Sequence, residues 1–462
     1  MMLNMRNIAT GAAIAAAASY LACAAFAADK QGLAEAYVEE PTPSVFKVMI
    51  SPVDGPIYTT VEGKALYSWP RKELRNGGTA DMKGSASNCD DVKTTENAGM
   101  MSPYPGGLEL PELDARPTCA QAWPAVIAAN DAKPVGKWSL IPRHDKRLQW
   151  AYDGQVLYTS NLDKQPGDTI GGSKMNGGRG GNGGGDSPAY RIPIGPPADV
   201  PGQFVVQQDN AGRALILSNG MTAYAFNGDA PNKSNCNDAC ARQWTPVFAP
   251  EIGSLKRKDW SVVKRKSGES QWAYRGQPLY TFTGDSAPNV RDGLDVPGWH
   301  LALTQPAPAW PKSFTVQDTR GGVVLADSRG HTIYIYGCGD DSMDQLSCDH
   351  PDMTQAYRYA VCGGGDPVRC AKTFPYVVAA KNETSLNSTW TVIDIDPKTG
   401  HRAKAGQADA LRVWAYRDRP VYTFIRDDRP GTARAQAWGE FNGERNGFFA
   451  FWLRLQMTGR VI

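Results

Sequence analysis

The clearest pattern along the chain is an alternation of aromatic and small residues that predicts short β-hairpins. Trp-Ala-Tyr, followed six residues later by a second Tyr, occurs at Trp150–Tyr158, Trp272–Tyr280 and Trp414–Tyr422. Residues i and i+2 of a strand lie on one face, so each Trp–Tyr pair marks a half-buried strand. Asp153-Gly154 and Arg275-Gly276 fall where a two-residue hairpin turn is expected. The pattern therefore predicts three related hairpins.

Each of these hairpins follows a second hairpin that also ends in a Tyr, at Gly63–Tyr67, Gly220–Tyr224 and Gly330–Tyr334. Such repetition is typical of tandem modules. The interpretation is an all-β fold of mainly short antiparallel strands and hairpins, in three tandem repeat modules of two half-modules each.

Proline-rich stretches place the three modules at 44–196, 203–305 and 312–462. The spacers recur once per module rather than once per half-module. An open row of three modules is therefore favoured, and propeller-like closure stays open as the alternative.

The first residues predict export. Arg6 precedes an apolar run over residues 8–26, and Ala25-Phe26-Ala27 has the small-x-small pattern of a cleavage site. Residues 1–27 are interpreted as a signal peptide and 28–43 as an N-terminal linker. Lipid anchoring at Cys23 is the disfavoured alternative, because Tyr20 stands where an aliphatic residue is usual. The mature chain has no predicted transmembrane segment, so a periplasmic or extracellular location is expected.

The composition agrees with a β-rich exported protein. Gly (48) and Pro (33) are frequent, as expected for many turns. The 49 basic and 47 acidic residues nearly balance, which argues against a nucleic-acid partner. Eight cysteines follow Cys23, and an oxidising compartment favours pairing them. They are Cys89, Cys119, Cys236, Cys240, Cys338, Cys348, Cys362 and Cys370.

The second module carries the fullest set of motifs. Tyr224–Asp229 and Tyr280–Asp285 both read Tyr-x-Phe-x-Gly-Asp, and Trp299-His300 closes the module. With the Cys-Ala-x-x-Trp segment at Cys240–Trp244, these motifs resemble the secreted-repeat family. Its members are bacterial lipoproteins with the motif Yx(FWY)xxD. The resemblance implies an envelope location, and it raises an electron-transfer role as one option for the aromatic residues.

The other two modules depart from the motif, the third at one copy and the first at both, since Ser160 stands at the second aromatic position after Tyr158. Lys72 stands at the first Asp position of the first module, whereas Asp163 keeps the second. Gly339 stands at the first Asp position of the third module, beside Asp340, whereas Asp427 keeps the second. If the motif carries a site, the second module is its best-preserved copy.

Two interpretations of the motif residues remain. Tyr and Phe two positions apart share a strand face, and the Asp falls in the following turn, where its carboxylate can accept backbone N–H groups. Core packing is favoured over an aromatic-lined recess for a planar ligand. The candidate site residues are Tyr224, Phe226, Asp229, Trp272, Tyr274, Tyr280, Phe282, Asp285, Trp299 and His300.

The cysteine spacing favours structural bridges. Comparison of the modules suggests Cys89–Cys119, Cys236–Cys240 and Cys348–Cys370, with Cys338–Cys362 as an extra bridge, although four cysteines allow three pairings. No Cys-x-x-Cys redox pair and no Cys-x-x-Cys-His haem attachment sequence occurs.

Other catalytic signatures are missing from the sequence. The five histidines lie apart, so no metal site is predicted. The Gly-rich stretch Gly171–Gly185 lacks the Gly-Lys-Ser/Thr of a phosphate-binding loop. No cofactor and no oligomeric state is indicated. The leading hypothesis is a non-enzymatic binding or scaffold protein with an envelope protein or polymer as partner. The alternative is an electron-transfer accessory protein using Tyr/Trp clusters or a bound redox cofactor.

Overall fold

The computed structural model describes residues 34–69, 81–89, 97–98, 108–109, 117–172, 192–250, 257–338, 349–440 and 446–455. The predicted signal peptide, Cys23, Cys348 and most of the Gly-rich stretch lie outside the described residues. The sheets are antiparallel and the helices are short, which confirms the predicted β-rich class.

Every sheet takes its strands from one of three consecutive stretches of the chain, β1–β9, β10–β19 or β20–β28. We call these stretches the N-terminal, central and C-terminal groups. The N-terminal group contains the hairpin β1–β2, the five-stranded sheet β6-β7-β8-β3-β9 and the pair β4–β5. Their bounds are β1 Phe46–Ser51, β2 Gly55–Thr60, β3 Tyr67–Ser68, β4 Asn97–Ala98, β5 Leu108–Glu109, β6 Trp138–Pro142, β7 Leu148–Tyr152, β8 Gln155–Tyr158 and β9 Ile192–Pro193. Helix α2 covers Cys119–Ala122, and the 3₁₀ turn η2 covers Ile170–Gly172.

The central group contains three sheets, ordered β10-β11-β19, β13-β17-β12-β18 and β14-β15-β16. Their bounds are β10 Phe204–Asp209, β11 Gly212–Leu217, β12 Tyr224–Phe226, β13 Trp244–Pro246, β14 Trp260–Lys264, β15 Ser270–Tyr274, β16 Gln277–Pro278, β17 Tyr280–Phe282, β18 Trp299–Leu301 and β19 Leu303–Pro306. Helix α3 covers Ala239–Gln243, and η3 covers Asp292–Asp295.

The C-terminal group contains the sheet β20-β21-β28 and the six-stranded sheet β23-β24-β25-β22-β27-β26. Their bounds are β20 Thr315–Thr319, β21 Gly322–Ala326, β22 Tyr334–Cys338, β23 Trp390–Ile395, β24 Leu411–Tyr416, β25 Arg419–Tyr422, β26 Trp438–Glu440, β27 Asn446–Ala450 and β28 Trp452–Leu455. Helices α4 (Ala356–Gly363) and α5 (Pro367–Thr373) pack against each other between β22 and β23.

The three Trp-Ala-Tyr hairpins form as predicted, and their turns explain the sequence between the strands. Both central turn residues have positive φ in each copy, namely Asp153-Gly154, Arg275-Gly276 and Arg417-Asp418. A two-residue turn with this backbone matches the right-handed twist of the flanking strands. Arg417-Asp418 adopts it without a glycine, which is costly for ordinary side chains.

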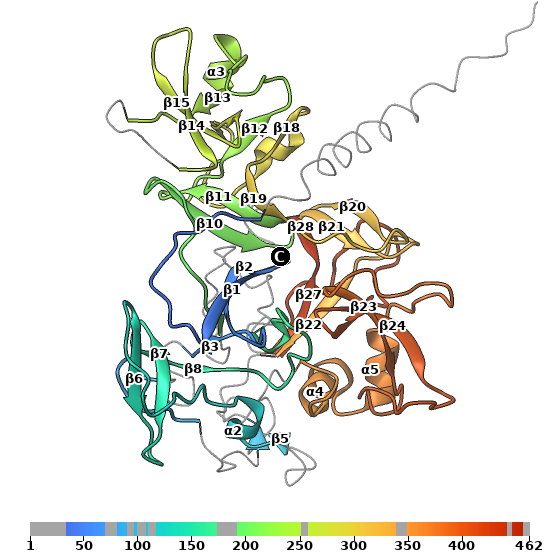
Figure 1. The fold of residues 1–462 in the computed structure, drawn as a ribbon. Helices are drawn as coiled ribbons and strands as arrows, with labels where there is room; N and C mark the ends of the chain where they lie inside the picture. The colour runs from blue at the N-terminus through green and yellow to red at the C-terminus, as the bar shows by residue number, and fades with distance from the viewer. Residues whose placement is uncertain are drawn as a thin grey trace, which may run out of the picture.

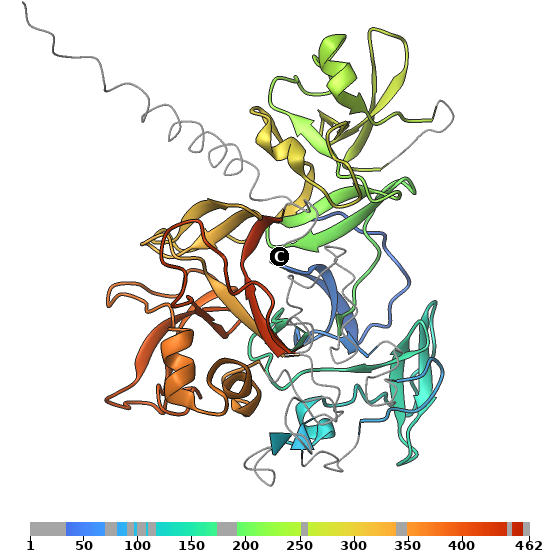
Figure 2. The same cartoon turned by 180° about the vertical axis from the view of Figure 1, so that it is seen from behind.

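The strands do not close into a ring. Over the described ranges each sheet is open, so propeller-like closure is not observed. In Figures 1 and 2 the hairpins β1–β2, β10–β11 and β20–β21 gather near the middle of the molecule, and the Trp-Ala-Tyr hairpins lie toward its periphery. Each group has two apolar cores, formed where the buried faces of its sheets pack together.

Polar contacts join the groups near the middle. Gln305 Nε2 of the central group donates to the carbonyls of Ser51 and Pro52, each over 2.8 Å. Asn210 Nδ2 donates to the carbonyl of Trp452 over 3.1 Å. Met353, between β22 and β23, is buried in a core otherwise made of N-terminal-group residues. The three groups therefore share buried contacts rather than standing apart on free spacers.

The predicted N-terminal linker is also fixed at two points. Glu35 is almost fully buried and accepts hydrogen bonds from Arg213 of β11 over 2.7 and 2.8 Å. Glu40 accepts from Tyr152 of β7 over 2.6 Å and from Lys137 over 2.5 Å. One short segment thus binds both the N-terminal and the central group.

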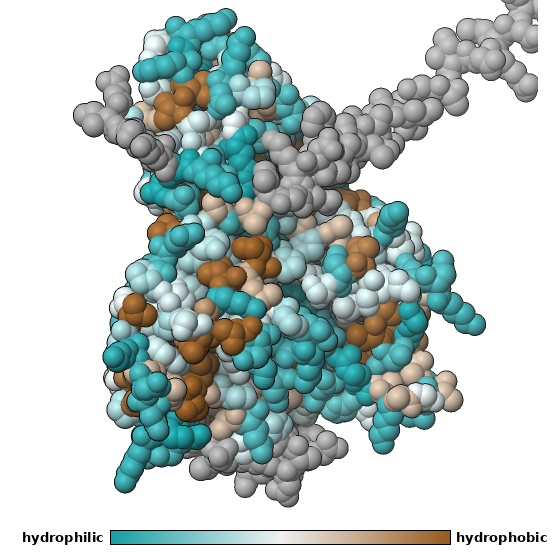
Figure 3. Space-filling model, viewed as in Figure 1, coloured by the Kyte–Doolittle hydropathy of each residue, from teal (hydrophilic) through white to brown (hydrophobic). Residues whose placement is uncertain are grey.

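The outer surface mixes polar and apolar residues. Figure 3 shows several apolar patches, and a large one lies over the N-terminal group. Exposed apolar side chains of that group include Val45, Ile50 and Val61. Among the described residues, no helix is both long and apolar enough to cross a membrane.

Candidate functional site

The two full motif copies meet at the centre of one sheet. Strands β12 and β17 are neighbours in the order β13-β17-β12-β18, and Tyr224 pairs directly with Tyr280. On the outer sides, Phe226 pairs with Trp299 and Phe282 pairs with Trp244. The sheet is therefore approximately two-fold symmetric about the β12–β17 contact, with one motif copy on each side.

Each motif tyrosine is bonded to the aspartate of the other copy. The Tyr224 hydroxyl donates to Asp285 Oδ2 over 2.7 Å, and the Tyr280 hydroxyl donates to Asp229 Oδ2 over 2.7 Å. The other oxygen of each carboxylate accepts a backbone N–H from the loop that follows, from Asn235 for Asp229 and from Gly293 for Asp285. The motif residues thus form two reciprocal cross-links between the copies.

Burial sets the protonation of these pairs. It raises the pKa of Tyr224 and Tyr280, and the neighbouring carboxylates raise it further, so both phenols stay neutral. Burial also raises the pKa of Asp229 and Asp285, although the hydrogen bonds from the tyrosines and from backbone N–H groups act in the opposite direction. Each pair joins a neutral donor to a carboxyl group that the interior makes costly to ionise.

A stack of aromatic rings covers the two cross-links. Trp244 and Trp299 lie face to face, with 3.5 Å between ring centroids and 4° between planes. Phe226 stacks on Trp299 at 4.6 Å, and Phe282 lies 4.6 Å from Trp244 at a tilt of 37°. Tyr280 and Trp299 lie edge to face, with 5.0 Å between their ring centroids. Each symmetric half contributes one Trp and one Phe to the stack.

The glycine of each motif copy is required because it lies against the phenylalanine of its own copy. A Cβ on Gly228 would lie 2.4 Å from a ring carbon of Phe226, and a Cβ on Gly284 would lie 2.3 Å from a ring carbon of Phe282. Neither distance is possible for a real carbon contact, so only glycine allows the turn to lie on the ring. The fifth position of Tyr-x-Phe-x-Gly-Asp therefore has a packing reason.

The structure divides the residues proposed from sequence between two places. Eight of them lie in or beside this cluster: Tyr224, Phe226, Asp229, Tyr280, Phe282, Asp285, Trp299 and His300. Trp272 and Tyr274 instead belong to a second core of the central group, where Trp260 contacts both rings. His300 pairs with Ala225 across β12–β18, and its Nε2 lies 3.4 Å from Gln277 Nε2.

Two residues of the cluster were missing from the sequence-based set. Trp244 completes the ring stack, and the only sequence signal for it was its place in the Cys-Ala-x-x-Trp segment. Arg265 is buried and donates to Ser234 over 2.8 Å and to the carbonyl of Cys236 over 2.6 Å. Ser234 Oγ lies 2.8 Å from the Tyr280 hydroxyl. Arg265 lies in a polar stretch that reads as a turn, so the sequence gave no sign that it would be buried beside the motif residues.

The N-terminal group keeps both cross-links, although its sequence has lost one motif aspartate. Tyr67 donates to Asp163 Oδ2 over 2.7 Å. Tyr158 donates to Asp81, which lies nine residues after the Lys72 that occupies the motif position. The Tyr158 hydroxyl also lies 2.7 Å from Ser87 Oγ, a contact that matches the one between the Tyr280 hydroxyl and Ser234 Oγ. An aspartate farther along the chain therefore replaces the motif aspartate.

The C-terminal group replaces one cross-link by a cation. Tyr334 donates to Asp427 Oδ2 over 2.6 Å. Tyr422 instead lies under the guanidinium of Arg358, 5.4 Å from its ring centroid. Arg358 is fully buried on α4, where it donates to the Tyr376 hydroxyl over 3.0 Å and to Gln355 Oε1 over 2.9 Å. Asp340, which the sequence placed beside the lost position, lies outside the described residues.

Disulfides confirm two of the expected pairings and correct the others. Cys89–Cys119 and Cys236–Cys240 form as expected. Cys362 is bonded to Cys370, so the expected bridges Cys348–Cys370 and Cys338–Cys362 are wrong. The reason is that α4 and α5 form a tight helical hairpin that brings these two Cα atoms to 4.7 Å. Cys338 is also disulfide-bonded, and Cys348 lies outside the described residues.

Within the described ranges, His, Cys, Asp and Glu side chains form no cluster of three or more that could hold a metal ion. The polar groups of the motif copies are instead bonded to one another. The cluster has the chemistry of a packed, cross-linked core with aromatic rings at its edge.

Comparison with known proteins places the two motif copies in a family. A family model for a secreted repeat of unknown function matches residues 205–248 and 261–302. The first match spans β10 to β13 and the second spans β14 to β18, so the reciprocal Tyr–Asp bonds join one repeat to the other. No curated protein and no solved structure matches the chain. The chain thus carries two repeats of the secreted repeat family, between residues 205 and 302.

Proposed function

We propose that this protein is an exported envelope protein that acts as a rigid, non-enzymatic binding scaffold. In this proposal residues 1–27 are the signal peptide, and the mature chain has three tandem modules of two repeats each, at 44–196, 203–305 and 312–462. The partner is an envelope protein or polymer, and the location is periplasmic or extracellular.

The observation that carries the proposal is the reciprocal bonding of the motif residues. Tyr224 and Tyr280 use their hydroxyls on the opposite repeat, so the most distinctive residues of the chain hold repeats together. The same Tyr–Asp bond recurs at Tyr67–Asp163 and Tyr334–Asp427. A scaffold needs this rigidity, because a preformed surface loses less entropy when it binds.

Contacts between the strand groups support the same function. The Glu35–Arg213 pair and the Arg417–Asp54 pair each join different parts of the chain at buried positions. Apolar patches such as that over the N-terminal group in Figure 3 are the kind of surface on which partners dock. Together these features favour one fixed surface presented by three modules.

The test is recovery of a partner by the folded mature protein from solubilised envelope. The bait is the mature chain, and the matched control is the same chain after reduction and alkylation of its disulfides. A defined protein or polymer retained by the folded bait, absent from the control and bound again by purified bait, is the expected result. If purified bait binds nothing that was recovered, the scaffold function is wrong.

A second candidate function is electron transfer, and the ring stack favours it. Trp244 and Trp299 are in face-to-face contact, and Tyr280 touches Trp299 while its hydroxyl is bonded to Asp229. Closely spaced Trp and Tyr rings with a nearby proton acceptor suit stepwise oxidation. An absorption spectrum of the protein as isolated, with voltammetry, tests this idea. A protein with neither visible absorption nor a reversible redox wave would eliminate it.

A further inference from the structure

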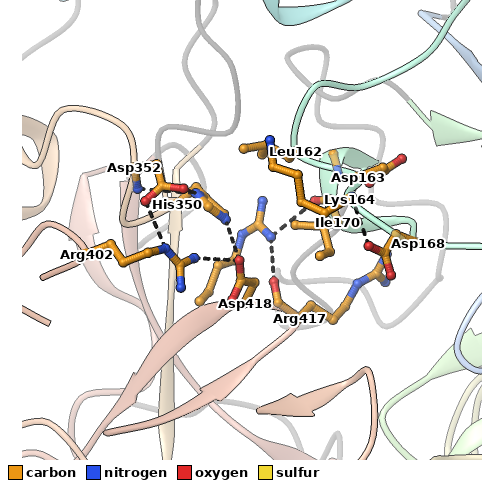
Figure 4. A network of polar contacts seen from close by, with 12 residues as sticks. Leu162, Asp163, Lys164, Asp168, Ile170, His350, Asp352, Arg402, Arg417 and Asp418 are labelled. Carbon is orange, nitrogen blue, oxygen red and sulfur yellow. Dashed lines mark hydrogen bonds and ion pairs between the residues drawn. The ribbon is translucent and has the colours of Figure 1, made fainter. Parts of the chain in front are cut away.

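The N-terminal and C-terminal strand groups meet at the segment that follows Asp163. Arg417 of the β24–β25 turn donates to the Thr169 carbonyl over 2.6 Å and lies 3.1 Å from Asp54 Oδ2. Arg419 Nη1 donates to the Ile170 carbonyl over 3.2 Å. Figure 4 shows Arg417 between this segment and the C-terminal group. Two arginines of one group thus bind backbone carbonyls of the other.

Asp163 holds the same segment from the opposite side. Its Oδ2 accepts the hydroxyl of Tyr67 over 2.7 Å, and its Oδ1 accepts the backbone N–H of Gly171 over 3.1 Å. Asp163 is 9% exposed. Residues 169–171 are therefore clamped between one carboxyl group inside the N-terminal group and the arginines of the C-terminal group.

Several charged groups surround this clamp. Asp168 lies on the same segment, Asp54 comes from the β1–β2 turn, and Arg417 comes from the β24–β25 turn. Beyond Arg417, Asp418 is bonded to His350 over 3.2 Å and to Arg402 over 2.6 Å. Arg402 also binds Asp352, and Arg419 is paired with Asp349 over 2.8 Å. Figure 4 shows the His350–Asp418–Arg402 cluster beside the clamp.

Burial gives Asp163 a titration near neutrality. It raises the pKa of this carboxyl group to about 7, against the lowering effect of the hydrogen bonds from Tyr67 and from backbone N–H groups. An aspartate in an opened, solvated segment has a pKa of about 3.9. The clamped form therefore binds a proton that the opened form releases.

We propose that Asp163 is a pH-responsive latch that couples the N-terminal group to the C-terminal group and loosens as the pH rises toward neutrality. The direction of the pH effect follows from the raised pKa of Asp163. Clamping gains stability from the bound proton, this gain is complete below the opened-state value, and it is lost as pH rises through about 7. His350 acts in the opposite sense on the acid side, because burial lowers its pKa.

Asp427 offers a matched control. It accepts the Tyr334 hydroxyl over 2.6 Å and the Arg434 backbone N–H over 3.0 Å, which repeats the geometry of Asp163. The contacts described for the segment after Asp427 come from the C-terminal group itself, for example Thr332 to the Thr432 carbonyl. A titration at Asp427 therefore leaves the junction untouched.

Hydrogen exchange of the mature protein tests the latch. From pH 6.5 to 8.5 the opening equilibrium of residues 163–172 should rise about fourfold after correction for intrinsic exchange, as proton linkage to a group with a pKa of about 7 requires. Residues 411–422 should change in parallel, because they lose the Thr169 and Ile170 carbonyls. Asp163→Asn should abolish both changes, whereas Asp427→Asn should leave both in place.

A second variant keeps the test decisive if Asp163→Asn fails to fold. Tyr67→Phe removes a hydrogen bond that stabilises the ionised carboxylate, so the midpoint of the change should move to higher pH. An unshifted midpoint, a pH-independent opening of 163–172 in the natural protein, or a change in 163–172 without one in 411–422 would each overturn the proposal.

Discussion

Tyr224 of one repeat donates its hydroxyl hydrogen bond to Asp285 of the other repeat, and Tyr280 returns the same bond to Asp229. The Tyr and Asp of one motif are close in the sequence, but this closeness does not mean that they are bonded to each other. The Tyr and Asp of one copy do not serve each other. They serve the neighbouring copy, so each repeat depends on the other for a hydrogen-bond partner of its Tyr and of its Asp.

Removal of one cross-link should destabilise the central group. Tyr224→Phe leaves Asp285 without its side-chain donor in a buried place, which should cost about 1–3 kcal/mol in the free energy of unfolding. Urea unfolding followed by tryptophan fluorescence measures the loss. Tyr274→Phe is the control, because the Tyr274 hydroxyl lies a long 3.5 Å from Asp259 and should matter little. Equal losses in both variants would contradict the assignment.

The contact between Gly228 and Phe226 predicts a strong effect from one methyl group. Gly228→Ala places a Cβ where a ring carbon of Phe226 lies 2.4 Å away, so the ring or the turn must shift. Overpacking of this kind costs about 1–3 kcal/mol. Gly202→Ala, where no atom lies within 4 Å of the added Cβ, should be nearly neutral. Thermal unfolding of the two variants distinguishes these expectations.

The Cys362–Cys370 bridge has a direct chemical check. Trypsin cleaves after Arg369 and thus separates the two cysteines onto different peptides. Without reduction these peptides should be recovered as one disulfide-linked species by mass spectrometry. A Cys348–Cys370 species in its place would restore the pairing expected from the repeats.

The same bridge should contribute to stability. Cys362→Ser together with Cys370→Ser removes a short cross-link between α4 and α5. The loop-entropy relation gives a loss of about 2–3 kcal/mol for a bridge of this span. Protection of residues 356–373 from hydrogen exchange should fall, and protection of the central group should stay unchanged.

His350 should make the C-terminal group less stable in acid. Its Nδ1 accepts the Asp352 backbone N–H over 3.2 Å, so its Nε2 carries the proton that faces Asp418. Burial lowers the pKa of His350, whereas an unfolded histidine titrates near pH 6.5. The unfolded chain therefore binds more protons below that pH, and stability falls as pH falls through about 6.5.

The check is the urea midpoint of the natural protein and of His350→Gln at pH 7.5 and 5.5. The variant should lose less stability between the two values, because one proton-binding group is gone. His144→Gln, on the exposed turn between β6 and β7, is the control and should behave as the natural protein does.

Much of the local structure could be predicted from the sequence, because it depends on near neighbours. The Trp-Ala-Tyr hairpins form over the expected residues, since strand alternation and a two-residue turn are local properties. The Cys89–Cys119 and Cys236–Cys240 bridges follow for a similar reason. In both modules the second cysteine of the bridge is followed directly by Ala and, four positions on, by Trp, so the two copies could be compared with each other.

Only the tertiary structure decided how the repeats share their side chains. Reciprocal Tyr–Asp bonding depends on β12 and β17 lying side by side, and no spacing within one motif reveals it. Asp81 replaces the motif aspartate, and Arg358 lies over Tyr422, and both residues lie outside the repeated motifs, so the repeat pattern does not predict these roles. Asp163 and Arg417, far apart in the chain, likewise hold the same segment, the first through the Gly171 N–H and the second through the Thr169 carbonyl. Local pattern determined the strands, whereas burial and long-range pairing determined what their polar residues do.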